Sequence, residues 1–143
     1  MKELIKAKEI LLSGNYTCVL CKDEDIYTSV QRGVKPLVVW LKSENDFKGY
    51  IAADKVVGKA TAFLYVLLGV KAVYAHVISE SALLVLNQNN IRVEYAELVE
   101  NIINRQKDGI CPFEAAVLDI CNPTTAYDII LNKMREMNIS LDT

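Results

Sequence analysis

The dipeptide Gly58-Lys59 stands where a short turn of small residues gives way to an apolar helical run, and this position suggests phosphate chemistry. A P-loop needs another glycine five positions earlier and a serine or threonine directly after the lysine. Ala53 and Ala60 occupy those positions, so the sequence excludes a P-loop. The free N–H groups and the dipole of a helix start still favour an anion there, and Lys59 adds a positive charge. The alternative is a solvated lysine beside a glycine chosen for tight packing.

A second helix start, Ser79-Glu80-Ser81, follows the next strand along the chain. Ser79 is a good N-cap residue, and that role alone accounts for it. Ligands of α/β sheets bind beyond the carboxyl ends of parallel strands. If the two strands are neighbours, both helix starts face one crevice, and we expect Lys59 to lie near Ser79 and Ser81 at its mouth.

Two titratable residues lie close to these helix starts in the sequence. Asp54 belongs to the turn before Lys59, where it could cap the helix, pair with Lys59 or bind a ligand. We expect it beside Lys59 at the mouth of the pocket. His76, the one histidine, is either a packed core residue or a ligand-binding group of the same pocket.

The stretch "GICPFEAAVLDI" places Cys111 at an N-cap, Pro112 at the first helical position and Glu114 at the third. This is the layout of a capping box in which cysteine replaces serine or threonine. A thiolate at a helix N-terminus is stabilised by the dipole, which would make Cys111 a nucleophile with Asp54 or Glu114 as acid or base. The alternative is a buried, inert thiol.

The remaining cysteines do not predict a metal site. Cys18 and Cys21 lie in a strand, where residues three apart point to opposite faces, and no second pair follows at zinc spacing. We expect reduced thiols, no bound metal and no cofactor.

Composition limits the class of protein. The 143 residues are 52% hydrophobic and 24% charged, which predicts one folded domain over residues 1–143. A net charge of -2 without a lysine or arginine cluster argues against nucleic-acid binding. The longest apolar run, Ala60 to Val70, is too short to span a bilayer, and the N-terminus has no apolar signal core. We therefore expect a cytoplasmic protein with no membrane partner.

Helical and strand patterns alternate along the chain, which predicts an α/β fold with a partly parallel sheet. Helices are expected at residues 4–12, 36–41, 59–68, 80–88, 98–104, 112–120 and 123–137. Strands are expected at residues 17–22, 26–30, 50–53, 72–77 and 91–95, the first two as a hairpin.

Four segments in order, "IAADKVVGKATA", "KAVYAHVISESAL", "ELVENIINR" and "GICPFEAAVLDI", resemble an uncharacterised prokaryotic family, a domain of unknown function with a cytidine-deaminase-like fold. The resemblance covers nearly the whole chain and implies a three-layer α/β/α architecture with a mixed sheet. Deaminases hold zinc with His/Cys sets at two helix starts, and this chain has neither set. The resemblance therefore implies a remnant pocket without zinc-dependent deamination.

Three functions stay open from the sequence. The first is a metal-free domain that binds a nucleotide or another small anion through Gly58, Lys59, His76, Ser79 and Ser81. The second is an enzyme of altered chemistry with Cys111 as nucleophile, and the third is a structural homo-oligomer.

Overall fold

The computed structural model describes residues 2–104, 106–107 and 109–141. Helices and strands alternate along them, as the sequence pattern predicts. The elements are α1 (Lys2–Ser13), β1 (Cys18–Lys22), β2 (Asp25–Ser29), α2 (Lys35–Lys42), β3 (Ile51–Val57), α3 (Lys59–Leu68), β4 (Ala72–Ser79), α4 (Glu80–Gln88), β5 (Arg92–Val99), α5 (Pro112–Ala116) and α6 (Pro123–Glu136).

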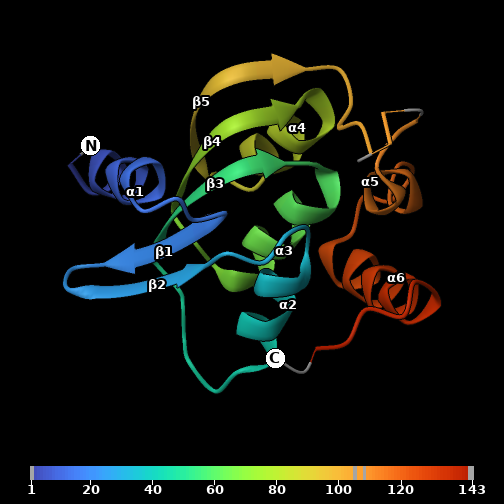
Figure 1. Cartoon of the computed structure of the whole chain (residues 1–143), viewed down its shortest axis with the longest axis horizontal. Helices are drawn as coiled ribbons and strands as arrows, with labels where there is room; N and C mark the ends of the chain where they lie inside the picture. Colours follow the sequence, from blue (N-terminus) through green and yellow to red (C-terminus); the bar gives the residue numbers. More distant parts are fainter. Residues whose placement is uncertain (1, 105, 108, 142–143) are drawn as a thin grey trace.

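The strands form one mixed sheet in the order β2-β1-β3-β4-β5. The hairpin strand β1 lies antiparallel to both β2 and β3, whereas β3, β4 and β5 are parallel to one another. The strands before α3 and α4 are thus direct neighbours, as the crevice argument required. Figure 1 shows the arrowheads of β3, β4 and β5 pointing toward the side of the molecule where α5 lies.

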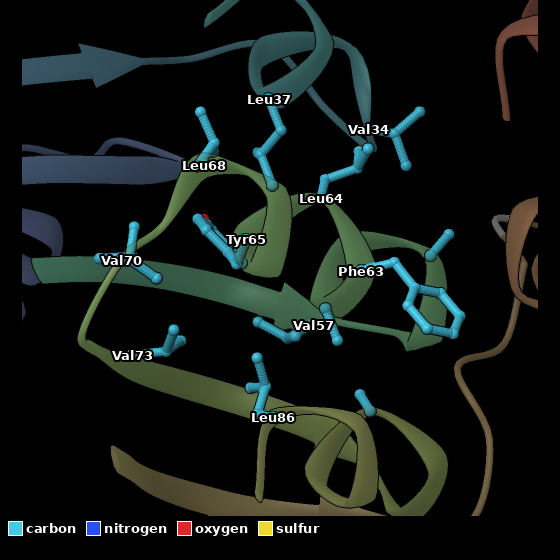
Figure 2. Close-up of a cluster of buried hydrophobic side chains, with 14 of the residues drawn as sticks. Val34, Leu37, Val57, Phe63, Leu64, Tyr65, Leu68, Val70, Val73 and Leu86 are labelled. Atoms are coloured by element: carbon cyan, nitrogen blue, oxygen red, sulfur yellow. The ribbon is translucent and has the colours of Figure 1, made fainter. Parts of the chain in front are cut away.

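Helices cover both faces of the sheet and make three layers, which confirms the α/β/α expectation. On one face, α1 packs Leu4, Ala7 and Leu11 against side chains of β1, β3 and the start of β4. The other helices cover the opposite face, where the larger core lies. Figure 2 shows this core, in which Leu37 of α2 and Leu64 of α3 lie above the sheet residues Val57 and Val73.

The two cysteines of the first strand lie on opposite faces of the sheet. Cys18 belongs to the larger core and Cys21 to the core under α1, and both are buried free thiols. This arrangement confirms the interpretation of their spacing.

The predicted helix at residues 98–104 is wrong. β5 continues to Val99, because its pairing with β4 extends through the partners Ile78–Leu98 and Ser79–Val99. Backbone pairing with a long neighbouring strand overrides the helical preference of the local sequence. The helix that begins at Pro112 is also shorter than expected, since it ends at Ala116.

The stretch before Gly58 is a strand and not a turn. β3 reaches Val57, and Val56 and Val57 pair with Val77 and Ile78 of β4. β-branched residues favour this extended backbone. Asp54 is therefore a residue of the strand interior, five positions before α3 begins at Lys59.

No helix of the described residues is both long and apolar enough to span a membrane.

Candidate functional site

A groove of about 130 Å³ lies between α3, α4 and the segment that joins α5 to α6. Its lining combines a cation, a hydroxyl, two amides and apolar side chains. These residues are Lys59, Phe63, Ser81, Leu84, Val85, Gln88, Asn89, Ile120 and Cys121. Lys59 and Ser81 come from the two consecutive strand–helix units, so the structure brings them to one groove, as the sequence predicts.

Lys59 lies in the first turn of α3 and is held by the segment that follows α5. Its ammonium donates a hydrogen bond of 2.6 Å to the carbonyl oxygen of Leu118 and lies 5.7 Å from the centre of the Phe63 ring. A lysine ammonium has three donors. The contact with Leu118 uses one of them, and the others are available to a ligand in the groove.

Ser79 and Ser81 form a hydrogen-bonded chain at the start of α4. Ser79 is fully buried and is the N-cap, and its hydroxyl accepts the backbone N–H of Ala82 at 3.3 Å. The hydroxyls of Ser79 and Ser81 are 3.3 Å apart. Ser79 is thus a structural cap, whereas Ser81 reaches the groove.

The Ser81 hydroxyl is hydrogen-bonded to Glu114, which is 2% exposed. One carboxylate oxygen of Glu114 accepts a hydrogen bond from the Ser81 hydroxyl at 3.1 Å, and the other accepts the backbone N–H of Ile102 at 2.8 Å. Glu114 therefore does not complete a capping box with Cys111. The N–H of Cys111 donates instead to the carbonyl of Ile102 at 2.8 Å.

Gly58 leaves room for the Glu114 carboxylate because it has no side chain. A Cβ at Gly58 would lie 3.2 Å from Oε2 of Glu114 and 3.2 Å from Cγ1 of Ile102. Gly58 is the N-cap of α3, so the carboxylate lies beside the start of α3 and is bonded to the first turn of α4. The region that the sequence predicts for an anion holds an anionic group of the chain itself.

Asp54 is not at the mouth of the groove. Its carboxylate accepts the Tyr65 hydroxyl at 2.7 Å and the backbone N–H of Val56 at 3.2 Å. It does not cap α3, whose N-cap Gly58 has no side-chain cap. Burial raises the pKa of Asp54 to about 7, although the bonds from Tyr65 and the backbone act in the opposite direction. The extension of β3 beyond Ala53 is the reason for this different placement.

His76 also lies away from the groove. It is exposed and follows Ala72 and Tyr74 on the strand, and these two residues face α1. Side chains two apart on a strand share a face. The expected role of His76 in the pocket therefore has no geometric support.

The cysteine in the groove is Cys121 and not Cys111. Cys111 is the N-cap of α5, as the sequence predicts, but its thiol makes no capping hydrogen bond and it is half-buried. Cys121 is exposed and lines the groove together with Lys59. No spacing rule could have identified Cys121, because α5 ends at Ala116 and a turn carries the chain back to α3.

Within residues 2–104, 106–107 and 109–141, no three His, Cys, Asp or Glu side chains come together as candidate metal ligands.

Comparison with known families matches residues 6–134 to the model of TM1506, a domain of unknown function called DUF1893. The chain belongs to the DUF1893 family. A solved structure of similar shape is the DUF1893 family protein TM1506 from Thermotoga maritima, with a TM-score of 0.86 and 28% identity. The match covers 93% of this DUF1893 chain and 91% of that one. The search of curated proteins gave no match.

Proposed function

We propose that this DUF1893 protein binds a small anion in the groove between α3, α4 and the segment joining α5 to α6. The observation that carries the proposal is that Lys59 and Ser81, from two consecutive strand–helix units, line one groove. Lys59 supplies the charge and free donors, whereas the amides of Gln88 and Asn89 lie at the C-terminal end of α4, where that of Asn89 donates to the Val85 carbonyl. Lys59 and Ser81 lie in the first turns of α3 and α4, and the helix dipole favours a negative charge only within about one turn of these helix starts.

The size of the groove favours a small ligand. Pockets for drug-sized ligands have volumes of about 300–1,000 Å³. A groove of about 130 Å³ suits an oxyanion such as phosphate, or a short carboxylic acid. A nucleotide would enter with its phosphate and leave its base outside, so phosphate is the group to test first.

An enzyme built on Cys111 has less support. The hydrogen bonds of Asp54 go to Tyr65 and Val56, and those of Glu114 go to Ser81 and Ile102. Neither carboxylate is thus bonded to the thiol that it would serve as acid or base. A deaminase-like ancestry remains part of the proposal, supported by two helix starts that meet at one end of the sheet.

Isothermal titration calorimetry with inorganic phosphate tests the proposal. The wild type is expected to bind, and Lys59→Ala is expected to bind at least about tenfold more weakly, because a charge-assisted hydrogen bond is worth roughly 1.5–3 kcal/mol. Lys71→Ala is the matched control, since Lys71 is exposed and lies outside the groove. Equal affinities for all three proteins, or no binding to the wild type, would contradict the proposal.

Self-association through β5 is a second candidate, favoured by the character of this strand. β5 is one of the two edge strands and runs for eight residues, and its side chains Tyr95 and Leu98 are 44% and 40% exposed. In Figure 1 no described element covers its outer edge. Long uncovered edges with apolar side chains pair with other strands.

The charges of β5 suggest the register of such a pair. In an antiparallel pair centred on Ala96, residues 93–99 of the two copies pair, and Arg92 of one copy lies opposite Glu100 of the other, twice by symmetry. Size-exclusion chromatography with light scattering is expected to give a dimer for the wild type. Arg92→Glu is expected to give a monomer, and the exchange Arg92→Glu with Glu100→Arg is expected to restore the dimer. A monomeric wild type would refute self-association.

A further inference from the structure

We infer that Glu114, which lies behind Ser81 beside the groove, competes with a bound anion, so that an anion in the groove takes the Ser81 hydroxyl and releases the Glu114 carboxylate together with the Ile102 amide. This inference rests on the proposed binding of an anion beside Lys59 and Ser81. It adds a conformational response to that binding.

Glu114 and an anion would compete for a single hydrogen. A serine hydroxyl has one donor hydrogen. Ser81 lines the groove, and its hydroxyl donates to Oε1 of Glu114, with 3.1 Å between the two oxygens. An anion is an acceptor only, so it competes with Glu114 for this hydrogen. Ser79 cannot substitute, because its hydroxyl is buried and belongs to the cap of α4.

Charge acts in the same direction as the hydrogen bond. The carboxylate of Glu114 lies beside Gly58 at the start of α3, one residue before Lys59. An anion in the adjacent groove is repelled by this carboxylate and attracted by the same helix start. Occupation of the groove and the bonded position of Glu114 therefore oppose each other.

The packing of α5 indicates that anion binding would move the Glu114 side chain and not the helix. Phe113 and Val117, on either side of Glu114, are 8% and 0% exposed and hold the helix in the main core. The Glu114 side chain has no such anchor beyond its bonds to Ser81 and Ile102. Its release frees the Ile102 N–H, which then exchanges with solvent, while the amide of Ala115 keeps its bond to the Cys111 carbonyl.

Affinity for the anion should then depend on Glu114. A ligand that binds only one of two states has an apparent affinity reduced in proportion to the fraction of molecules in that state. Here the competent state is the one in which Glu114 has left Ser81. Glu114→Gln removes the charge and weakens the competitor, so we expect phosphate to bind about tenfold more tightly to this variant than to the wild type. Glu80→Gln is the matched control. It removes a charge from the first turn of α4 at an exposed residue outside the groove.

The test combines phosphate calorimetry on the wild type, Glu114→Gln and Glu80→Gln with hydrogen exchange of the wild type. Support requires tighter binding to Glu114→Gln than to Glu80→Gln, with phosphate accelerating exchange at Ile102 and not at Ala115. If phosphate binds all three proteins equally and leaves exchange at Ile102 unchanged, the competition is overturned and the anion site stands. If phosphate binds none of them, both proposals are overturned.

Discussion

Replacement of Glu114 by alanine should destabilise the fold far more than the loss of a helix-surface carboxylate. The side chain is 2% exposed and accepts two hydrogen bonds, from Ser81 and Ile102. A buried donor that loses its partner costs about 1–3 kcal/mol. Loss of the partner of the Ile102 amide should cost an amount in the upper part of this range, because the backbone fixes this donor. The cost for Ser81 should be smaller, because its half-buried hydroxyl can rotate toward another acceptor. We expect a loss of about 3–4 kcal/mol in total.

Urea unfolding followed by circular dichroism measures this loss, with Glu80→Ala as the control. Glu80 is an exposed residue of the first turn of α4, so its removal should cost at most about 1 kcal/mol through the helix dipole. Glu114→Gln keeps an oxygen for Ile102 and should lie between the two variants. The reasoning is refuted if Glu114→Ala unfolds within about 1 kcal/mol of the wild type, because two buried donors would then have found other partners without cost.

Three further changes probe the neighbouring residues. Gly58→Ala should lower the free energy of unfolding in urea by about 1–3 kcal/mol, because its Cβ would lie 3.2 Å from Glu114 Oε2. The loss should be smaller in a Glu114→Ala background. Additive effects of the two substitutions would contradict the contact. Burial raises the pKa of the Asp54 carboxyl from 3.8 to about 7, so the folded state holds this proton more tightly than the unfolded state. The stabilisation is full below pH 3.8 and disappears as the pH rises through 7, and Asp54→Asn should flatten urea stability between these values. An unchanged pH profile for Asp54→Asn would reject the assignment. Alkylation at neutral pH with mass mapping should label the exposed Cys121 before the half-buried Cys111, and the reverse order would reject the placement of these thiols.

The sequence predicted the elements whose signals are local. The helix of residues 59–68 was predicted with its observed bounds, because Gly69 ends it with a backbone φ of 80°. The Ser79 cap set the start of α4 in the same way. The alternation of strands and helices predicted a partly parallel sheet, and in the structure β3 and β4 are parallel neighbours.

The failures have a common physical cause, which is long-range pairing. β3 and β5 are longer than their local sequences indicate because each is extended by pairing with β4. That extension places Asp54 in the strand interior beside Tyr65, where no helix start can use it.

The partners of Glu114 could not be read from spacing either. Its position suggested a local bond to Cys111, but Ile102 lies 12 residues away and Ser81 lies 33 residues away. Only the return of the chain from β5 past α3 and α4 brings these groups together, and that path carries no motif.

The most direct test of an anion site at this groove is a phosphate titration followed by backbone amide NMR. The account predicts saturable shifts at the first turns of α3 and α4, centred on Lys59 and Ser81, with Ile102 shifting in parallel, and their loss in Lys59→Ala. Shifts that stay absent at millimolar phosphate, or that cluster around the lysines near the N-terminal end of α1, would contradict it.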